Sequence, residues 1–204
     1  MRDVLVADIG GTNARFAMAD LRTLELSSFQ RYRCAEFPSL PAVARQFLSE
    51  VSRRPSAAAV AVAAPVAGER VQFTNSPWSI TKEELRASLE VDELLLLNDF
   101  EALAHALPHL APVEFHQIGG SSAVETGTKA VLGPGTGLGV AGLVWSKTGW
   151  LALPSEGGHA AFAVTDAREF DILERLMAGR EHLSVERVVS GPGIADVYRV
   201  LTEL

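Results

Sequence analysis

The sequence has one cysteine, no long apolar run and few positive charges. A single cysteine, Cys34, excludes an internal disulfide and a thiolate zinc cluster and fits a reducing compartment. The longest apolar stretch, residues 57–67, contains Pro65 and is far shorter than the roughly 20 residues that cross a bilayer. Asp3 and Asp8 interrupt any apolar core of a signal peptide. We therefore expect a cytoplasmic protein with no membrane span.

The charge balance argues against a nucleic-acid partner. The chain carries 18 Lys and Arg against 25 Asp and Glu, a net charge of −7, whereas binding to a nucleic-acid backbone needs clustered positive charge. An acidic protein that binds a polyphosphate must rely on backbone N–H groups, hydroxyls and a metal ion. Nearly half of the 204 residues are apolar, which is enough for one large or two modest folded domains.

The first motif is a glycine turn between two strand-like runs, residues 4–9 and 14–19. Its residues are Gly10, Gly11, Thr12 and Asn13. Glycine tolerates positive φ, so such a turn can be tight and its amides can converge on an anion such as phosphate. Asp8 would repel that phosphate unless Mg²⁺ lay between them, bound to Asp8 largely through water. The alternative is an ordinary hairpin with Asp8 as a turn former. Arg15 can offset phosphate charge or face solvent, and we assign it no role.

A second turn repeats this design later in the chain. Residues 129–132 and 140–145 have strand character, and the segment between them carries Gly133, Gly135, Thr136 and Gly137. The glycines alternate and a strand follows, whereas a dinucleotide-binding fingerprint opens a helix. We expect Thr136 to play the same part as Thr12, so that two turns bind one polyphosphate.

Asn98 and Asp99 mark the change from a strand over residues 94–97 to a helix. Either residue could simply cap the helix. The carboxyl end of a parallel strand is also where open α/β sheets bind ligands, and an Asp there can accept a proton from a substrate hydroxyl. The local sequence does not decide between these alternatives.

Other polar residues are candidates for sugar recognition. Glu156 and His159 lie in a glycine-containing loop and could share hydrogen bonds with vicinal hydroxyls, although they lack the third ligand of a metal site. Asn75, beside Trp78, is a weaker candidate in a polar loop. Glu186, taken alone, would be a solvated charge.

The remaining periodicities predict an α/β protein in two parts. Residues 108–127 are rich in Pro, Gly, His and Ser, so we expect domains over residues 1–109 and 110–204. Expected strands outside the two turns are 26–34, 57–64 (buried on both faces), 70–74 and 150–153, and expected helices are 39–51, 81–89, 165–178 and 194–204.

Five segments in this order, DIGGTNARFA, LLNDFEALA, GPGTGLGV, SEGGHAAF and ERVVSGPGI, resemble the bacterial glucokinase family, the hexokinase-type branch of the actin-like ATPase superfamily. The resemblance covers essentially the whole chain. It implies an actin-like ATPase (ribonuclease H-like) fold with two α/β domains around a cleft. The cysteine-rich zinc motif of the related ROK sugar kinases has no counterpart here.

The resemblance also implies the chemistry. The γ-phosphoryl of ATP, with Mg²⁺, would pass to the 6-hydroxyl of D-glucose, with Asp99 as the base. Asn98, Glu156, His159 and Glu186, with Asn75 as an addition, would bind the sugar. The two glycine turns would be the phosphate loops, and a homodimer is a further expectation.

One departure from the family concerns the nucleotide. The adenosine-binding Gly-Gly segment that the family carries late in its chain has no counterpart in these residues, so the second domain is expected to be incomplete. A non-catalytic sugar-binding or regulatory protein, or an inactive fragment, is therefore the alternative function. An ATPase without sugar specificity is a third, disfavoured by Glu156, His159 and Glu186.

Overall fold

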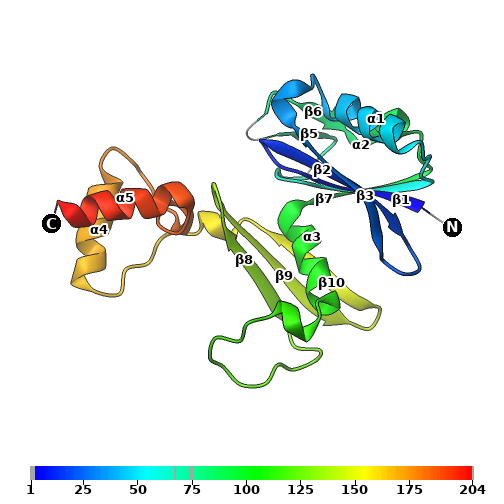
Figure 1. Cartoon of the computed structure of the whole chain (residues 1–204). Helices are drawn as coiled ribbons and strands as arrows, with labels where there is room; N and C mark the ends of the chain where they lie inside the picture. Colours follow the sequence, from blue (N-terminus) through cyan, green and yellow to red (C-terminus); the bar gives the residue numbers. More distant parts are fainter. Residues whose placement is uncertain (1–2, 67, 74–75, 204) are drawn as a thin grey trace. The chain divides into compact units, whose positions relative to one another are not determined.

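An antiparallel meander opens the chain and forms one side of a five-stranded sheet (Figure 1). The computed structural model describes residues 3–66, 68–73 and 76–203. Strands β1 (Asp3–Ile9), β2 (Asn13–Asp20) and β3 (Leu26–Arg33) pair antiparallel in sequence. The meander predicted from the sequence is confirmed, except that the third strand ends one residue earlier than expected, at Arg33.

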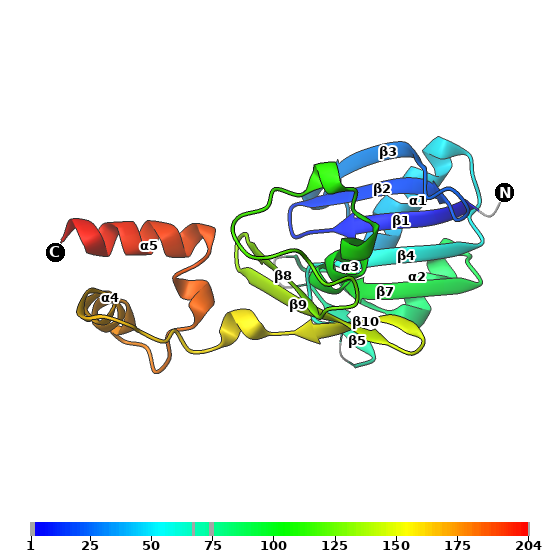
Figure 2. The ribbon, with the colours of Figure 1, turned by 90° about the horizontal axis from the view of Figure 1, so that it is seen from below.

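Two parallel strands complete this sheet. Strands β4 (Ala57–Val62) and β7 (Glu93–Asn98) extend it in the order β3-β2-β1-β4-β7, which can be followed in Figure 2. Strand β1 is parallel to β4, and β4 to β7, with Ile9, Val62 and Asn98 in one row. The carboxyl ends of all three strands therefore lie along one edge, and this edge carries both the first glycine turn and Asn98.

Helices α1 (Leu40–Val51) and α2 (Lys82–Leu89) cover the same face of the sheet (Figure 1). The capping box predicted for α2 is present: Thr81 Oγ1 accepts from Glu84 N–H at 3.0 Å, and Glu84 Oε2 accepts from Thr81 N–H at 2.8 Å. Because both helices lie on one face, β4 alternates fully and partly buried residues. The expectation that β4 is buried on both faces was too strong.

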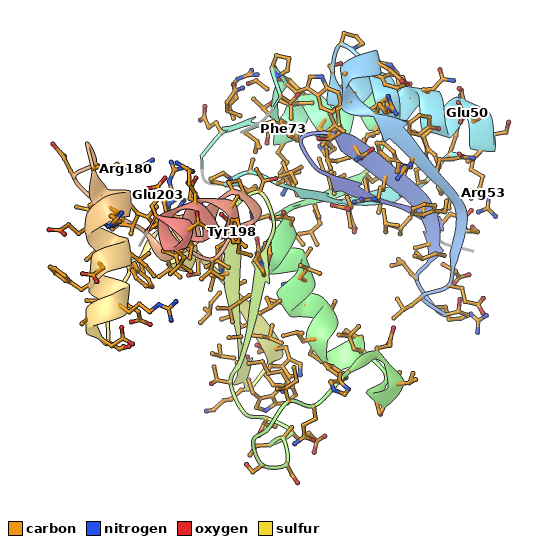
Figure 3. The ribbon with its side chains drawn as sticks, turned by 60° about the vertical axis from the view of Figure 1, so that its left-hand side comes forward. Glu50, Arg53, Phe73, Arg180, Tyr198 and Glu203 are labelled. Carbon is orange, nitrogen blue, oxygen red and sulfur yellow. The ribbon has the colours of Figure 1, made fainter. Side chains whose placement is uncertain are left out.

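A small hairpin contributes residues to the hydrophobic core of the five-stranded sheet and its helices. Strands β5 (Arg70–Gln72) and β6 (Ser79–Thr81) pair antiparallel. Phe73, labelled in Figure 3, packs edge to face against Trp78, with ring centroids 5.9 Å apart. Trp78 Nε1 donates to the carbonyl of Phe37 at 3.2 Å. Trp78 is therefore buried and anchors the hairpin in the core.

The second half of the chain contains a three-stranded antiparallel sheet and two helices. Strands β8 (Lys129–Pro134), β9 (Leu138–Ser146) and β10 (Gly149–Ser155) pair in sequence. Helices α4 (Ala167–Met177) and α5 (Gly191–Thr202) pack against each other around Leu176, Leu183 and Val200 (Figure 1). Short 3-10 turns lie at Leu107–His109 and Pro112–Glu114, within the segment expected to be a connection.

The chain divides into two units, Met1–Ala102 and Leu103–Leu204, and helix α3 (Asp99–Ala106) runs through the division. The boundary predicted after residue 109 falls within the second unit and stays a prediction. In the part of the chain that the structure describes, no helix has both the length and the apolar character needed to cross a bilayer.

Candidate active site

The first glycine turn, residues 10–12, connects β1 to β2 and is closed by a 2.9 Å hydrogen bond from Gly10 N–H to the carbonyl of Asn13. Neither Gly10 nor Gly11 has positive φ, which corrects the reason we gave for glycine here. A Cβ on Gly10 would lie 3.6 Å from the Asn13 carbonyl oxygen, an ordinary contact. The fold itself therefore tolerates a side chain at Gly10, and binding of a phosphate at this turn stays a prediction.

Cys34 donates two hydrogen bonds to this turn. It is buried at the start of a 3-10 turn, Cys34–Glu36, where its N–H donates to the Thr12 carbonyl at 2.9 Å and its Sγ to the Gly10 carbonyl at 3.3 Å. Burial raises the pKa of the thiol, so it stays neutral and serves as a donor. The sequence had placed Cys34 at the end of the expected strand 26–34, whereas it follows β3.

Asp8 and Arg15 face each other across β1 and β2 beside the turn. Arg15 Nη1 donates to Asp8 Oδ2 at 2.6 Å, and the two side chains are 44% and 51% exposed, respectively. Arg15, left unassigned from the sequence, therefore partly compensates the charge of the carboxylate that we expect to meet Mg²⁺. The register Asp8↔Arg15 is the signal that could have revealed this pair.

Asn98 and Asp99 both accept backbone hydrogen bonds at the start of α3. Asn98 Oδ1 accepts from Phe100 N–H at 2.9 Å and Glu101 N–H at 3.4 Å, while its Nδ2 donates to the Ala64 carbonyl at 3.2 Å. Asn98 thus caps α3 and ties β7 to the end of β4. The carboxylate of Asp99 accepts from the same Phe100 N–H, at 3.0 Å.

Burial raises the pKa of Asp99, and the negative charge of Asp8 raises it further, against the lowering effect of the Phe100 N–H. A half-buried carboxylate whose proton affinity is raised, at the carboxyl end of a parallel strand, suits a general base.

The second glycine turn connects β8 to β9. Gly135 N–H donates to the Gly137 carbonyl at 2.8 Å, which places Thr136 at the tip. Gly191 N–H, at the start of α5, donates to the Gly135 carbonyl at 2.8 Å. Leu138 N–H donates to Glu186 Oε2, also at 2.8 Å. The strand, turn and strand predicted here are confirmed, and a distant segment holds the turn at two points.

Glu156 and His159 lie side by side around the 3-10 turn η4 (Gly157–His159), with Glu156 Oε2 3.7 Å from His159 Nε2. Their side chains are 69% and 64% exposed, so they are accessible to a ligand. The 3-10 turn η5 (Val185–Arg187) carries Glu186 and is joined to η4, because Val185 N–H donates to the Ala160 carbonyl at 2.9 Å.

A glucokinase family model matches residues 5–204 of this chain. The chain belongs to the glucokinase family. The glucokinase of Tolumonas auensis is 43% identical over 198 residues, which are 97% of this chain and 62% of that relative. The bifunctional protein glk of Paraburkholderia xenovorans is 45% identical over 97% of this chain and 31% of its own length.

Solved structures share this fold. The crystal structure of glucokinase from an Antarctic psychrotroph matches with a TM-score of 0.85 at 37% identity, over 100% of this chain and 65% of that one. The glucokinase from Balamuthia mandrillaris, solved in complex with glucose, matches with a TM-score of 0.74 at 22% identity, over 99% and 63%. The expected actin-like ATPase fold of the glucokinases is confirmed. The chain spans about three fifths of the length of the glucokinases it matches.

Within this glucokinase-family chain, the predicted site residues form two groups. The first unit holds Asp8, Gly10, Gly11, Thr12, Asn13, Asn98 and Asp99, and the second holds Gly133, Gly135, Thr136, Gly137, Glu156, His159 and Glu186. Asn75 lies outside the described residues. No three His, Cys, Asp or Glu side chains among the described residues gather as a metal site. The roles of these residues stay predictions.

Gly158 fixes the position of η4 against the second turn, and its replacement tests that contact. A Cβ on Gly158 would overlap the carbonyl oxygen of Leu138, and backbone cannot move aside easily. We expect Gly158→Ala to lower the free energy of unfolding by about 1–3 kcal/mol and to weaken hexose binding. Urea denaturation and calorimetry with glucose measure the two effects. Gly142→Ala, where the nearest atom to the new Cβ is 3.5 Å away, is the control, and equal behaviour of both variants would contradict this account.

Proposed function

We propose that this protein is an ATP-dependent glucokinase, which transfers the γ-phosphoryl of ATP to the 6-hydroxyl of D-glucose. The single observation that carries the proposal is Asp99. Its carboxylate is half-buried, its pKa is raised, and Asn98 accepts two N–H groups at the start of the helix, of which Asp99 shares only one. Membership of the glucokinase family supports glucose as the acceptor and ATP as the donor.

Phosphoryl transfer needs alignment and charge compensation more than covalent help. In this proposal Asp99 orients the 6-hydroxyl and accepts its proton. Amides of the two glycine turns, with the hydroxyls of Thr12 and Thr136, bind phosphate oxygens. Asn98, Glu156, His159 and Glu186 bind the other sugar hydroxyls, and Asn75 is kept as a further sugar ligand.

Mg²⁺ belongs to the proposal, and the donor set of the first unit fits it. Mg²⁺ usually keeps several waters and takes one or two carboxylates with substrate phosphates, and Asp8 is an exposed carboxylate beside the first turn. Asp8 would hold the ion, largely through water, and the bound ion would neutralise phosphate charge. The free, buried thiol of Cys34 supports a cytoplasmic location. A homodimer also stays part of the proposal.

Thermal unfolding with separate ligands tests the proposal as a whole. We expect glucose and Mg-ATP each to raise the Tm of the 204-residue chain, and a coupled assay to detect glucose 6-phosphate. Stabilisation by glucose alone, with no product, would favour a non-catalytic sugar-binding protein. ATP hydrolysis that ignores glucose would favour an ATPase without sugar specificity.

Replacing Glu156 by Gln separates sugar binding from phosphate binding. The loss of a charged acceptor for hydroxyls is expected to raise the Kd for glucose about tenfold or more, since hydrogen bonds to charged groups contribute about 1.5–3 kcal/mol. The affinity for Mg-ATP should change little, because both glycine turns are untouched. Calorimetry with each ligand measures both values. Unchanged glucose affinity would remove Glu156 from the sugar site.

A further inference from the structure

The carboxylate of Glu186 lies on the second glycine turn. Its Oε2 accepts the Leu138 N–H at 2.8 Å, across 48 positions of sequence. A Cβ added to Gly137 would overlap the same oxygen, so the carboxylate rests directly against the backbone of the turn. An amide at the end of a proposed phosphate loop is thus already occupied by an acidic side chain.

This arrangement opposes phosphate binding. A bound carboxylate leaves no free Leu138 N–H for a phosphate oxygen, and its negative charge repels any anion that approaches the turn. Among the described residues, no Lys, Arg or His forms an ion pair with Glu186 that would cancel this charge. In the state that the structure describes, the second turn is therefore a poor anion site.

The two segments proposed to bind hexose, η4 and η5, both contact Leu138. Leu138 contacts Glu186 through its N–H and lies against Gly158 of η4 through its carbonyl oxygen. Glu156 and His159 flank Gly158, and the Val185 N–H to Ala160 hydrogen bond holds Glu186 close to them. A hexose bound by Glu156 and His159 would therefore present hydroxyls near the carboxylate that covers the turn.

We propose that Glu186 is a positioning residue that covers the second glycine turn until a hexose is bound. Hydroxyl groups of the sugar then donate to the carboxylate in place of the Leu138 N–H. The carboxylate moves away from the turn, which frees the Leu138 N–H and removes the negative charge from the turn. Hexose and polyphosphate then bind with positive coupling, and this coupling is reciprocal. The inference rests on the proposed hexose site at Glu156, His159 and Glu186.

Calorimetry on the 204-residue chain tests the coupling, with inorganic tripolyphosphate and Mg²⁺ as the probe of the phosphate turns. For the unmodified chain, saturating glucose should lower the Kd for tripolyphosphate by about 5–150-fold, the usual range of such couplings. Glu186→Ala should bind tripolyphosphate tightly without glucose, and glucose should add no more than about twofold. Glu186→Gln, which keeps an acceptor but loses the charge, should fall between the two.

Glu181→Gln is the matched control, since Glu181 is an exposed acid five positions away. It should keep the full glucose dependence of the unmodified chain. NMR provides a second readout that a purely structural role would not affect. In ¹⁵N-labelled protein, the Leu138 amide resonance should move upfield on addition of glucose, and should already be upfield in Glu186→Ala.

The outcomes distinguish this inference from the proposed function. Suppose that the chain binds glucose but that glucose changes tripolyphosphate binding equally in Glu186→Ala and in the control. Glu186 then does not cover the turn, and the proposed hexose site is unaffected. If Glu186→Ala strengthens tripolyphosphate binding although no variant binds glucose, the charge of Glu186 does oppose the anion, but hexose does not control it, and the proposed function fails. Absence of tripolyphosphate binding in every variant overturns the inference.

Discussion

Replacing Asp99 by Asn is expected to lower kcat for glucose phosphorylation by about 10²–10⁴-fold, the usual contribution of a positioned general base. The Kd for glucose should change by less than about threefold, because the amide can still accept the Phe100 N–H and hydrogen-bond the 6-hydroxyl. A coupled assay of glucose 6-phosphate formation and calorimetry with glucose, both on the 204-residue chain, measure the two values.

The pH dependence of the same reaction also tests whether Asp99 is the base. The base acts when deprotonated, and burial together with the charge of Asp8 raises the pKa of Asp99. The kcat/KM of the unmodified protein should therefore fall on the acid side at a higher pH than an ordinary Asp would give. Asp99→Asn should lack this acid limb. Asp92→Asn, an exposed acid immediately before β7, is the control. Asp99→Asn activity within a few-fold of the unmodified protein would exclude the base role.

Local patterns predicted the elements that depend on neighbours in sequence. The capping box at Thr81 and Glu84, the two glycine hairpins and the meander all involve residues a few positions apart or adjacent strands. Helical spacing of apolar residues predicted α1 and α4, and continuous apolar runs predicted β4 and β7. These features are confirmed because short-range chemistry alone determines them.

Contacts between distant residues explain what the sequence could not show. Cys34 bonds to the Gly10 carbonyl across 24 positions, and Glu186 bonds to Leu138 across 48. The sequence predicted no polar role for Cys34. For Glu186 it predicted only the sugar-binding role that the family resemblance implies. Once the register of β2 with β3 pairs Asn13 with Arg33, the next residue, Cys34, must lie at the first turn. The register was the missing information.

The start of the last helix shows a different limit. The last helix was expected over residues 194–204, but α5 begins at Gly191. Ser190 caps it by accepting from Gly193 N–H at 3.1 Å. A Cβ on Gly193 would lie 2.7 Å from the Arg187 carbonyl oxygen, so packing requires glycine within the first turn. The sequence alone did not show that close packing requires glycine at this position.

Phe47→Ala is expected to lower the free energy of unfolding of the first unit by about 3–5 kcal/mol. Phe47 on α1 is fully buried and stacks on Phe16 of β2, with ring centroids 5.4 Å apart and planes at 20°. Its removal leaves a cavity between the helix and the sheet that carries the first glycine turn. With an m-value of about 1–3 kcal/mol/M, the urea midpoint should fall by at least about 1 M.

Tryptophan fluorescence assigns the loss to one unit, because the chain has three tryptophans. Trp78 is buried in the first unit, whereas Trp145 and Trp150 form a cross-strand pair in the second. With Trp145 and Trp150 replaced by Phe, Trp78 alone reports unfolding around Phe47. Phe170→Ala removes the same ring from an exposed position on α4 and should change stability by less than about 0.5 kcal/mol. If both substitutions left the Trp78 transition at the same urea concentration, the packing of α1 on the sheet could not be what stabilises the first unit.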